Sequence, residues 1–341
     1  MRYPAFLPAG GTVGVIAPSF GCTEEPYISA AGSARAFFEA EGYAVRFGEN
    51  CFRSDGIGKS STPENCGAEI ERFFLNGDAD ILISMGGGET MCEDLEYVDF
   101  AALAAGQPKW FMGFSDNTNL TFLLPTLCDT AAVYGPNFPA FGQRPLHPAL
   151  TDALSLLRGT SLTAHNYPGW ELSSLKTPET PLVPYNITEP FRMRTFPGTG
   201  DAAFSGRLLG GCLDCLINLC GTRFDAVRAF NAKYKDDGVI WFLEACDLSP
   251  VAIRRALWQL MNAGWFENAK GFLIGRACRY ADEAFGLDRI SAFTGMLERL
   301  NRPVLLDLDI GHLPPMMPLI SGAKAEAVTK GNSLTVTMRP E

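Results

Sequence analysis

The sequence predicts an α/β protein built on a doubly wound parallel sheet, and three observations support this fold class. Apolar runs that suit buried strands alternate with stretches of helical periodicity through the first half of the chain. The runs are nearly continuously apolar, as in residues 12–17 (TVGVIA), which is typical of parallel strands covered on both faces. Small or polar residues follow several runs, at the strand ends where such sheets bind ligands.

The expected elements follow one another regularly. In the first half we expect strands at 12–17, 43–47, 79–85, 110–113 and 131–134, and helices at 28–41, 68–75 and 94–105. In the second half we expect strands at 202–209, 238–243, 270–275 and 304–308, and helices at 212–220, 250–263 and 289–300. Residues 323–338, with Gly331 and Asn332 at their centre, predict a closing β-hairpin.

The length of 341 residues exceeds what one hydrophobic core usually supports, so we expect two domains. The first covers residues 1–166 and the second covers residues 201–341. Residues 167–200 are rich in proline, threonine and glycine without a period, which predicts a linker or a lid. Within this segment we expect Trp170 and Tyr185 to face a substrate, with packing onto the domain as the alternative.

Composition limits the partners of the chain. Apolar residues make up 47% and charged residues 19%, as in globular proteins. The net charge of −10, with no basic patch to offset it, argues against nucleic acid or an anionic membrane as the main partner. No run reaches the roughly 20 apolar residues of a membrane span, and the first residues lack a signal-peptide core. We therefore expect no membrane partner and a cytoplasmic location.

The ten cysteines are best interpreted as small buried hydrophobic residues in a chain of this kind. Cys212, Cys215 and Cys220 include one CxxC motif inside a helical pattern. A zinc site needs four ligands, and neither a second CxxC nor a histidine lies nearby in the sequence. We therefore expect these cysteines to pack in the core and expect no metal site.

Residues 108–120 (PKWFMGFSDNTNL) predict a strand, a tight turn and a helix. Ser115 lies at the corner, where its hydroxyl would be exposed at the carboxyl end of the strand. The N–H groups of the following helix would favour negative charge in the same space. A nucleophilic serine needs both features, although a helix N-cap is the commoner role of a serine in this position.

A glycine turn, Gly86-Gly87-Gly88, follows the strand at 79–85. Without side chains, its backbone N–H groups can approach a ligand closely, and we expect Gly86 and Gly88 to contact the substrate. The turn matches neither a phosphate loop nor GxGxxG. It predicts either a flexible turn or an oxyanion donor that faces Ser115 across the sheet.

Glu244 and His312 complete a candidate triad with Ser115. Glu244 ends an apolar strand, where a buried carboxylate needs a partner. His312 lies in another strand-end loop and is the best placed of the three histidines to act as a base. Asp307 and Asp309 are rival partners for this histidine, but residues so near it along one strand rarely aim at the same imidazole.

Several short motifs occur together in a characteristic order. They are Pro18-Ser19, Gly86-Gly87-Gly88, Gly113-Phe114-Ser115-Asp116, Tyr134-Gly135-Pro136, residues 206–211 (GRLLGG), Phe242-Leu243-Glu244 and Gly311-His312. In these motifs the sequence resembles the LD-carboxypeptidase family of serine peptidases, which includes the microcin C immunity peptidases. The resemblance covers nearly the whole chain. One departure is Cys212, where family members often carry asparagine or a similar polar residue.

The resemblance implies a flavodoxin-like N-terminal domain joined to a smaller C-terminal α/β domain, in a homodimer. It implies that Ser115 is the nucleophile, His312 the base and Glu244 the residue that orients it. The backbone N–H groups of Gly87 and Asp116 would form the oxyanion hole. No metal or cofactor is implied.

Two classes of function follow from these observations. The first is a serine carboxypeptidase or amidohydrolase that cleaves an amide-type bond near a free carboxylate. Its substrate would be an L,D-linked cell-wall peptide or a peptidyl or aminoacyl nucleotide of the microcin C type. The second is a non-catalytic protein that binds a small ligand on the same scaffold. The presence of Ser115, Glu244 and His312 together favours the enzyme.

Overall fold

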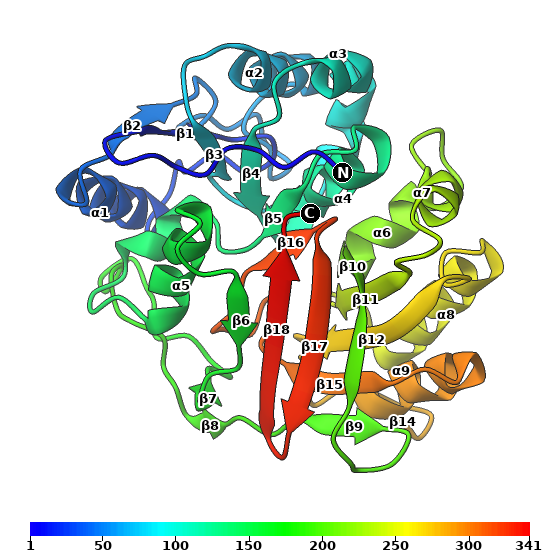
Figure 1. The fold of residues 1–341 in the computed structure, drawn as a ribbon. Coiled ribbons are helices and arrows are strands. Elements are labelled where there is room, and N and C mark those ends of the chain that lie inside the picture. The colour runs from blue at the N-terminus through cyan, green and yellow to red at the C-terminus, as the bar shows by residue number, and fades with distance from the viewer.

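The computed structural model describes residues 1–341 and contains two large sheets, each with a parallel core (Figure 1). The first sheet has the order β16-β5-β4-β3-β1-β2. Its parallel strands are β1 (Thr12–Ile16), β2 (Ala44–Phe47), β3 (Ile81–Ser84), β4 (Trp110–Gly113) and β5 (Ala132–Tyr134). The order 2-1-3-4-5 is that of flavodoxin-like folds, so the predicted fold class is confirmed.

The second sheet has the order β6-β18-β17-β10-β11-β12-β15-β9. Its central parallel strands are β10 (Ala203–Cys212), β11 (Val239–Glu244), β12 (Ala269–Gly275) and β15 (Val304–Leu308). The predicted hairpin is present as β17 (Lys324–Lys330) and β18 (Ser333–Arg339). The antiparallel edge strands are β6 (Thr163–His165) and β9 (Arg194–Phe196).

Two strands cross between the predicted halves of the chain. β16 (Leu319–Ser321) comes from the C-terminal half but pairs with β5 in the first sheet. β6 precedes residue 166 but pairs with β18 in the second sheet. The predicted linker or lid, residues 167–200, contains β7 (Gly169–Trp170), β8 (Glu189–Pro190) and β9. The two sheets are therefore tied together by strand pairing as well as by side-chain packing.

Nine α-helices accompany the sheets, and α6 to α9 lie together on one side of the second sheet (Figure 1). They are α1 (Tyr27–Ala40), α2 (Pro63–Leu75), α3 (Phe100–Ala105), α4 (Thr118–Leu127), α5 (Pro148–Leu157), α6 (Leu213–Leu219), α7 (Val227–Lys233), α8 (Pro250–Asn262) and α9 (Arg289–Leu297). Short 3₁₀ turns are η1 (Met91–Tyr97), η2 (Ser115–Asn117), η3 (Phe138–Gly142) and η4 (Glu298–Leu300). None of the helices is both long and apolar enough to cross a membrane.

Capping explains where two helices differ from prediction. α2 begins at Pro63 rather than at residue 68, because the Thr62 side chain caps it and proline suits the first turn. The helix predicted at 94–105 is divided into η1 and α3. Val98 is extended between the two, and the Asp99 side chain starts α3 by accepting from the N–H of Ala102.

Helix α4 carries the first sheet's contribution to the core of the second. Phe122 and Leu123 belong to the same buried cluster as Trp241 and Trp265, and the Phe122 and Trp265 rings stack at 5.1 Å. At the start of α4, the Thr118 hydroxyl accepts a hydrogen bond of 3.0 Å from the N–H of Cys212 at the end of β10. The carboxyl ends of the two sheets are thereby held against each other.

Candidate active site

Ser115 occupies a sharp corner between β4 and α4. Its φ of +65° is uncommon for a residue other than glycine, and backbone strain of this kind is concentrated at functional sites. The corner has the strand-to-helix arrangement of a nucleophile elbow, in which the serine Oγ is exposed above the sheet. Ser115 makes no capping hydrogen bond to the helix, so the alternative role as an N-cap is wrong.

The neighbouring Asp116 anchors this corner to two other strand-end loops. Its buried carboxylate accepts hydrogen bonds from the Ser19 hydroxyl at 2.6 Å and from the N–H of Met91 at 2.9 Å. The side-chain amide of Asn119 adds a third donor at 3.1 Å. Burial raises the pKa of Asp116, while the hydrogen bonds from Ser19 and Met91 oppose the rise. The side chain of Asp116 is thus structural, and only its backbone N–H faces the elbow.

The glycine turn after β3 lies directly against Ser115. A Cβ on Gly87 would lie 2.9 Å from Ser115 Oγ, which no ordinary side chain allows. The Asn117 side-chain amide donates to the carbonyl of Gly86 at 2.7 Å, and the N–H of Phe20 donates to the carbonyl of Gly87 at 2.8 Å. The backbone N–H groups of Gly87 and Asp116 donate no hydrogen bond within the protein. Both are therefore free for an acceptor beside Ser115.

His312 connects Ser115 to Glu244. The His312 Nε2 lies 2.8 Å from Ser115 Oγ, and its Nδ1 lies 2.9 Å from Glu244 Oε2. Both are ordinary hydrogen-bond distances. Gly311 has φ of +97°, and a Cβ there would come within 2.7 Å of the Glu244 carboxyl group. Glycine before His312 is therefore required both by the backbone and by the space that the carboxylate occupies.

Glu244 is fully buried, and both of its carboxylate oxygens have partners. Oε1 accepts a hydrogen bond of 2.6 Å from the Tyr134 hydroxyl, and Oε2 contacts His312. Tyr134 belongs to β5 of the first sheet, whereas Glu244 ends β11 of the second. The carboxylate therefore joins the two sheets at the site.

The surroundings of His312 favour its protonated form. Burial lowers the pKa of this imidazole, but the Glu244 carboxylate and the adjacent Cys246 outweigh burial, and the pKa lies well above its usual range. Phe114 packs against the edge of the ring at 5.0 Å. The imidazole is thus held in one orientation beside a carboxylate that stabilises its positive charge.

The two rival aspartates have other partners. Asp309 is buried in a salt bridge with Arg276 and accepts a hydrogen bond of 2.7 Å from the N–H of Tyr167. Asp307 forms salt bridges with Arg289 and Arg194. Neither contacts His312, so the ranking of Glu244 above both is in accord with the geometry.

A cavity of about 530 Å³ opens beside Ser115 and His312. Gly86, Gly87 and Gly88 line it, together with Tyr185 and a group of apolar residues that comprises Phe20, Tyr27, Phe114, Pro139 and Met316. Lys176 is the one lysine or arginine in its wall. Segment 167–200 thus supplies two cavity residues, Lys176 and Tyr185.

Trp170 does not line this cavity, contrary to the expectation that it faces a substrate. Its side chain is buried, packs at a tilt against the Tyr280 ring with a centroid distance of 4.9 Å, and lies against the Arg276 guanidinium. Packing was the alternative, and it prevails because the ring fills the space between the segment and the loop after β12.

A second, smaller pocket also borders Ser115. It also contains Cys246 and the acidic residues Glu89, Asp214 and Asp247. Burial raises the pKa of Glu89, and repulsion from Asp247 and the other nearby carboxylates adds to the rise. No lysine or arginine lines this pocket, so it favours neutral or cationic groups.

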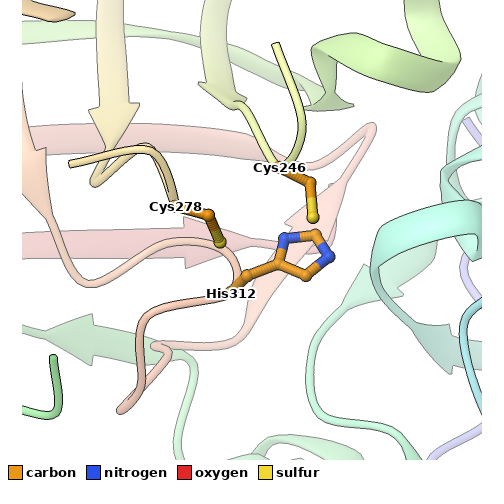
Figure 2. A group of neighbouring side chains, drawn as sticks. All are labelled: Cys246, Cys278 and His312. Atoms are coloured by element: carbon orange, nitrogen blue, oxygen red, sulfur yellow. The ribbon is translucent and has the colours of Figure 1, made fainter. Parts of the chain in front are cut away.

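The cysteines of the CxxC segment do not gather into a metal-binding cluster. The Cys215 thiol lies near the carbonyl of Ser115, and the Cys212 thiol lies near the carboxylate of Asp214. The one cluster of metal-ligand type is formed instead by Cys246, Cys278 and His312 (Figure 2). These two cysteines follow β11 and β12 and carry no sequence motif.

Sequence reasoning missed two residues of the site. Tyr134 enters the sequence analysis only as part of a motif, although a polar side chain at the end of a buried strand is a signal in itself. Lys176 lies in a segment without periodicity, and no local pattern predicts that it reaches the cavity.

Replacing Tyr134 by phenylalanine tests the support of the carboxylate. The change removes one donor to buried Glu244, and losing a hydrogen bond to a charged group costs about 1.5–3 kcal/mol. We expect kcat/KM to fall about tenfold. We also expect its acid limb to shift, because Glu244, the carboxylate that contacts His312, loses a hydrogen bond. Tyr97→Phe, at an exposed tyrosine, is the matched control and should change neither. An unaltered Tyr134→Phe enzyme would show that Glu244 needs no such support.

Comparisons with known proteins identify the family of the chain. The model of the LD-carboxypeptidase N-terminal domain matches residues 13–135, and that of the C-terminal domain matches residues 205–327. A probable murein peptide carboxypeptidase of Bacillus subtilis is 28% identical, over 94% of this chain and 90% of the relative. The microcin C7 self-immunity protein MccF of Escherichia coli is 24% identical, over 88% of this chain and 86% of the relative.

Solved structures share the fold. A point mutant of MccF in complex with adenosine monophosphate superposes with a TM-score of 0.83 at 21% identity, over 99% of each chain. An MccF-like protein from Bacillus anthracis has a TM-score of 0.81 at 21% identity, over 99% of this chain and 100% of its own. Since the two domain models together match well over half of the sequence, the chain belongs to the LD-carboxypeptidase family of serine peptidases.

Proposed function

We propose that Ser115, His312 and Glu244 form the catalytic triad of a serine carboxypeptidase that hydrolyses an amide-type bond near a free carboxylate. The observation that carries the proposal is the unbroken chain of hydrogen bonds from Ser115 Oγ through the imidazole to the buried carboxylate. A binding protein would have no need of this arrangement at a strained corner beside two free N–H groups.

The geometry supports acyl transfer in two steps. Ser115 Oγ attacks the carbonyl carbon while His312 Nε2 takes its proton, and Glu244 stabilises the imidazolium. The N–H groups of Gly87 and Asp116 hold the developing oxyanion. His312 then gives its proton to the leaving group, and water, activated in the same way, releases the acyl group from Ser115.

The large cavity suits an acyl compound whose leaving group is extended and contains an aromatic ring. Tyr27, Phe114 and Tyr185 offer aromatic surface, and Lys176 offers the positive charge that a carboxylate or a phosphate needs. Burial lowers the pKa of Lys176, and nearby Glu171 opposes the fall. These features favour an aminoacyl or peptidyl nucleotide, and solved structures of MccF hold adenosine monophosphate or aspartyl sulfamoyl adenosine.

A cell-wall peptide is the second candidate, because the Bacillus subtilis relative is named a probable murein peptide carboxypeptidase. Both candidates are anionic, the cell-wall peptide through its terminal carboxylate and aspartyl sulfamoyl adenosine through its aspartyl side chain, so Lys176 serves either one. The proposal also includes a homodimeric assembly and a cytoplasmic location. The role would be microcin immunity or peptidoglycan recycling.

A release assay distinguishes the two substrates. Purified enzyme is incubated with aspartyl sulfamoyl adenosine or with an L,D-linked muropeptide tetrapeptide, and the released amino acid is measured by mass spectrometry. We expect release from the nucleotide conjugate, with a higher KM and little change in kcat for Lys176→Gln, since Lys176 would bind ground state and transition state alike. Lys330→Gln, at an exposed lysine outside the cavity, is the control. Hydrolysis of neither substrate would overturn the proposal.

The pH dependence of kcat/KM tests the base. His312 must be neutral to accept a proton, and its pKa is raised, so kcat/KM should fall as pH drops through a value above about 6.5, the ordinary histidine pKa. Glu244→Gln removes the charge that raises this pKa, so the acid limb should move to lower pH while kcat falls by orders of magnitude. Both effects are read from profiles between pH 5 and 9.

Asp309→Asn is the contrasting variant. It leaves the buried Arg276 guanidinium without its carboxylate, which costs about 3–5 kcal/mol of stability, but it leaves the triad intact. We expect a lower melting temperature with an unshifted acid limb. A severe catalytic defect here, beside a mild one in Glu244→Gln, would transfer the orienting role to Asp309.

A further inference from the structure

Cys246 and Cys278 converge on the imidazole of His312. One ligand atom from each of the three residues lies within 4.8 Å of the other two. The cysteines follow the neighbouring parallel strands β11 and β12, and the N–H of Cys278 donates to the carbonyl of Ala245 at 2.9 Å, which fixes the two loops together. Figure 2 shows both sulfur atoms directed toward the His312 ring.

This cluster differs from the other cysteines of the chain. Cys22, Cys51, Cys66 and Cys128 are buried, as expected of packing residues. Cys246 and Cys278 are partly exposed, and they alone form a group with a histidine at ligand-to-ligand distances. Two thiols and an imidazole are the ligand set that Zn²⁺ and Cd²⁺ prefer, and a fourth position can be filled by water or a carboxylate.

An ion can reach the cluster from solvent. Cys246 lines the small pocket beside Ser115, and Glu89, Asp214 and Asp247 give that pocket a negative lining that attracts cations. The N–H groups of Cys246 and Asp247 donate to the Asp214 carboxylate at 3.0 and 2.9 Å, so the loop that presents the thiol is held in place.

We propose that Cys246, Cys278 and His312 form a binding site for a thiophilic divalent cation, and that Zn²⁺ bound there inhibits the enzyme reversibly. On binding, each thiol gives its proton to solvent and each thiolate donates an electron pair to the cation, so no oxidant is required. The binding site stands on geometry alone, whereas inhibition rests on the proposed function, in which His312 is the base.

Inhibition follows because the His312 imidazole belongs both to the proposed triad and to the metal site. Nε2 contacts Ser115 and Nδ1 contacts Glu244, so the triad loses one of these hydrogen bonds whichever nitrogen binds the ion. If Nε2 binds the ion, its lone pair can no longer accept the serine proton. If Nδ1 binds the ion, the ring proton resides on Nε2, which then has no lone pair for the serine proton. The metal would act as an inhibitor of the enzyme and not as its cofactor.

Two readouts test the proposal separately. Cd²⁺ is titrated into the metal-free enzyme while the ultraviolet cadmium–thiolate absorption is recorded, and ZnCl₂ is titrated while kcat/KM is measured. We expect one Cd²⁺ per chain and inhibition by Zn²⁺ that EDTA reverses. The double variant Cys246→Ser, Cys278→Ser should lose the absorption and, relative to its own metal-free activity, need at least about tenfold more Zn²⁺ for half inhibition.

Controls keep the outcomes distinct. Cys220→Ser, at a partly exposed cysteine outside the cluster, should retain both responses, and circular dichroism checks that each variant is folded. Ser115→Ala should still give the cadmium signal, so the site is tested even if no substrate is hydrolysed. Absence of the signal from folded wild-type enzyme, or equal inhibition of the double variant, would overturn the proposal.

Discussion

The buried carboxylate of Glu244 is the interaction on which the active site depends. With no exposure to water, it must have a partner for each oxygen, and it finds Tyr134 in the first sheet and His312 in the last strand-end loop. Removing either partner would leave a charged group unsatisfied in the core. The same requirement that stabilises the carboxylate therefore joins the two sheets and fixes the imidazole opposite Ser115.

The serine side of the site depends on backbone geometry. Ser115 holds a left-handed conformation because the two residues that follow it are tied down, Asp116 through its carboxylate and Asn117 through its side-chain amide. Gly87 can approach the hydroxyl closely because it lacks a side chain. The strain and the close contact place an exposed hydroxyl beside two free N–H groups, which is the environment an acyl-transfer nucleophile requires.

Much of the fold and of the candidate triad could be predicted from sequence, because both depend on local sequence patterns. Apolar periodicity predicted the parallel strands, and strand-end positions predicted Ser115, Glu244 and His312. What could not be predicted is decided by contacts between distant segments. The ring of Trp170 packs on Tyr280, the strand β16 joins the first sheet from the far end of the chain, and Cys246 and Cys278 meet only because β11 and β12 are neighbours.

Covalent labelling of Ser115 tests the central claim most directly. A fluorophosphonate reacts with a serine hydroxyl only when a base and an oxyanion hole activate it, and peptide mass spectrometry then locates the adduct. The account predicts a single adduct on the peptide that contains Ser115, formed far more slowly in His312→Ala and absent in Ser115→Ala. Labelling at another serine, or labelling of Ser115 at an unchanged rate without His312, would contradict the account.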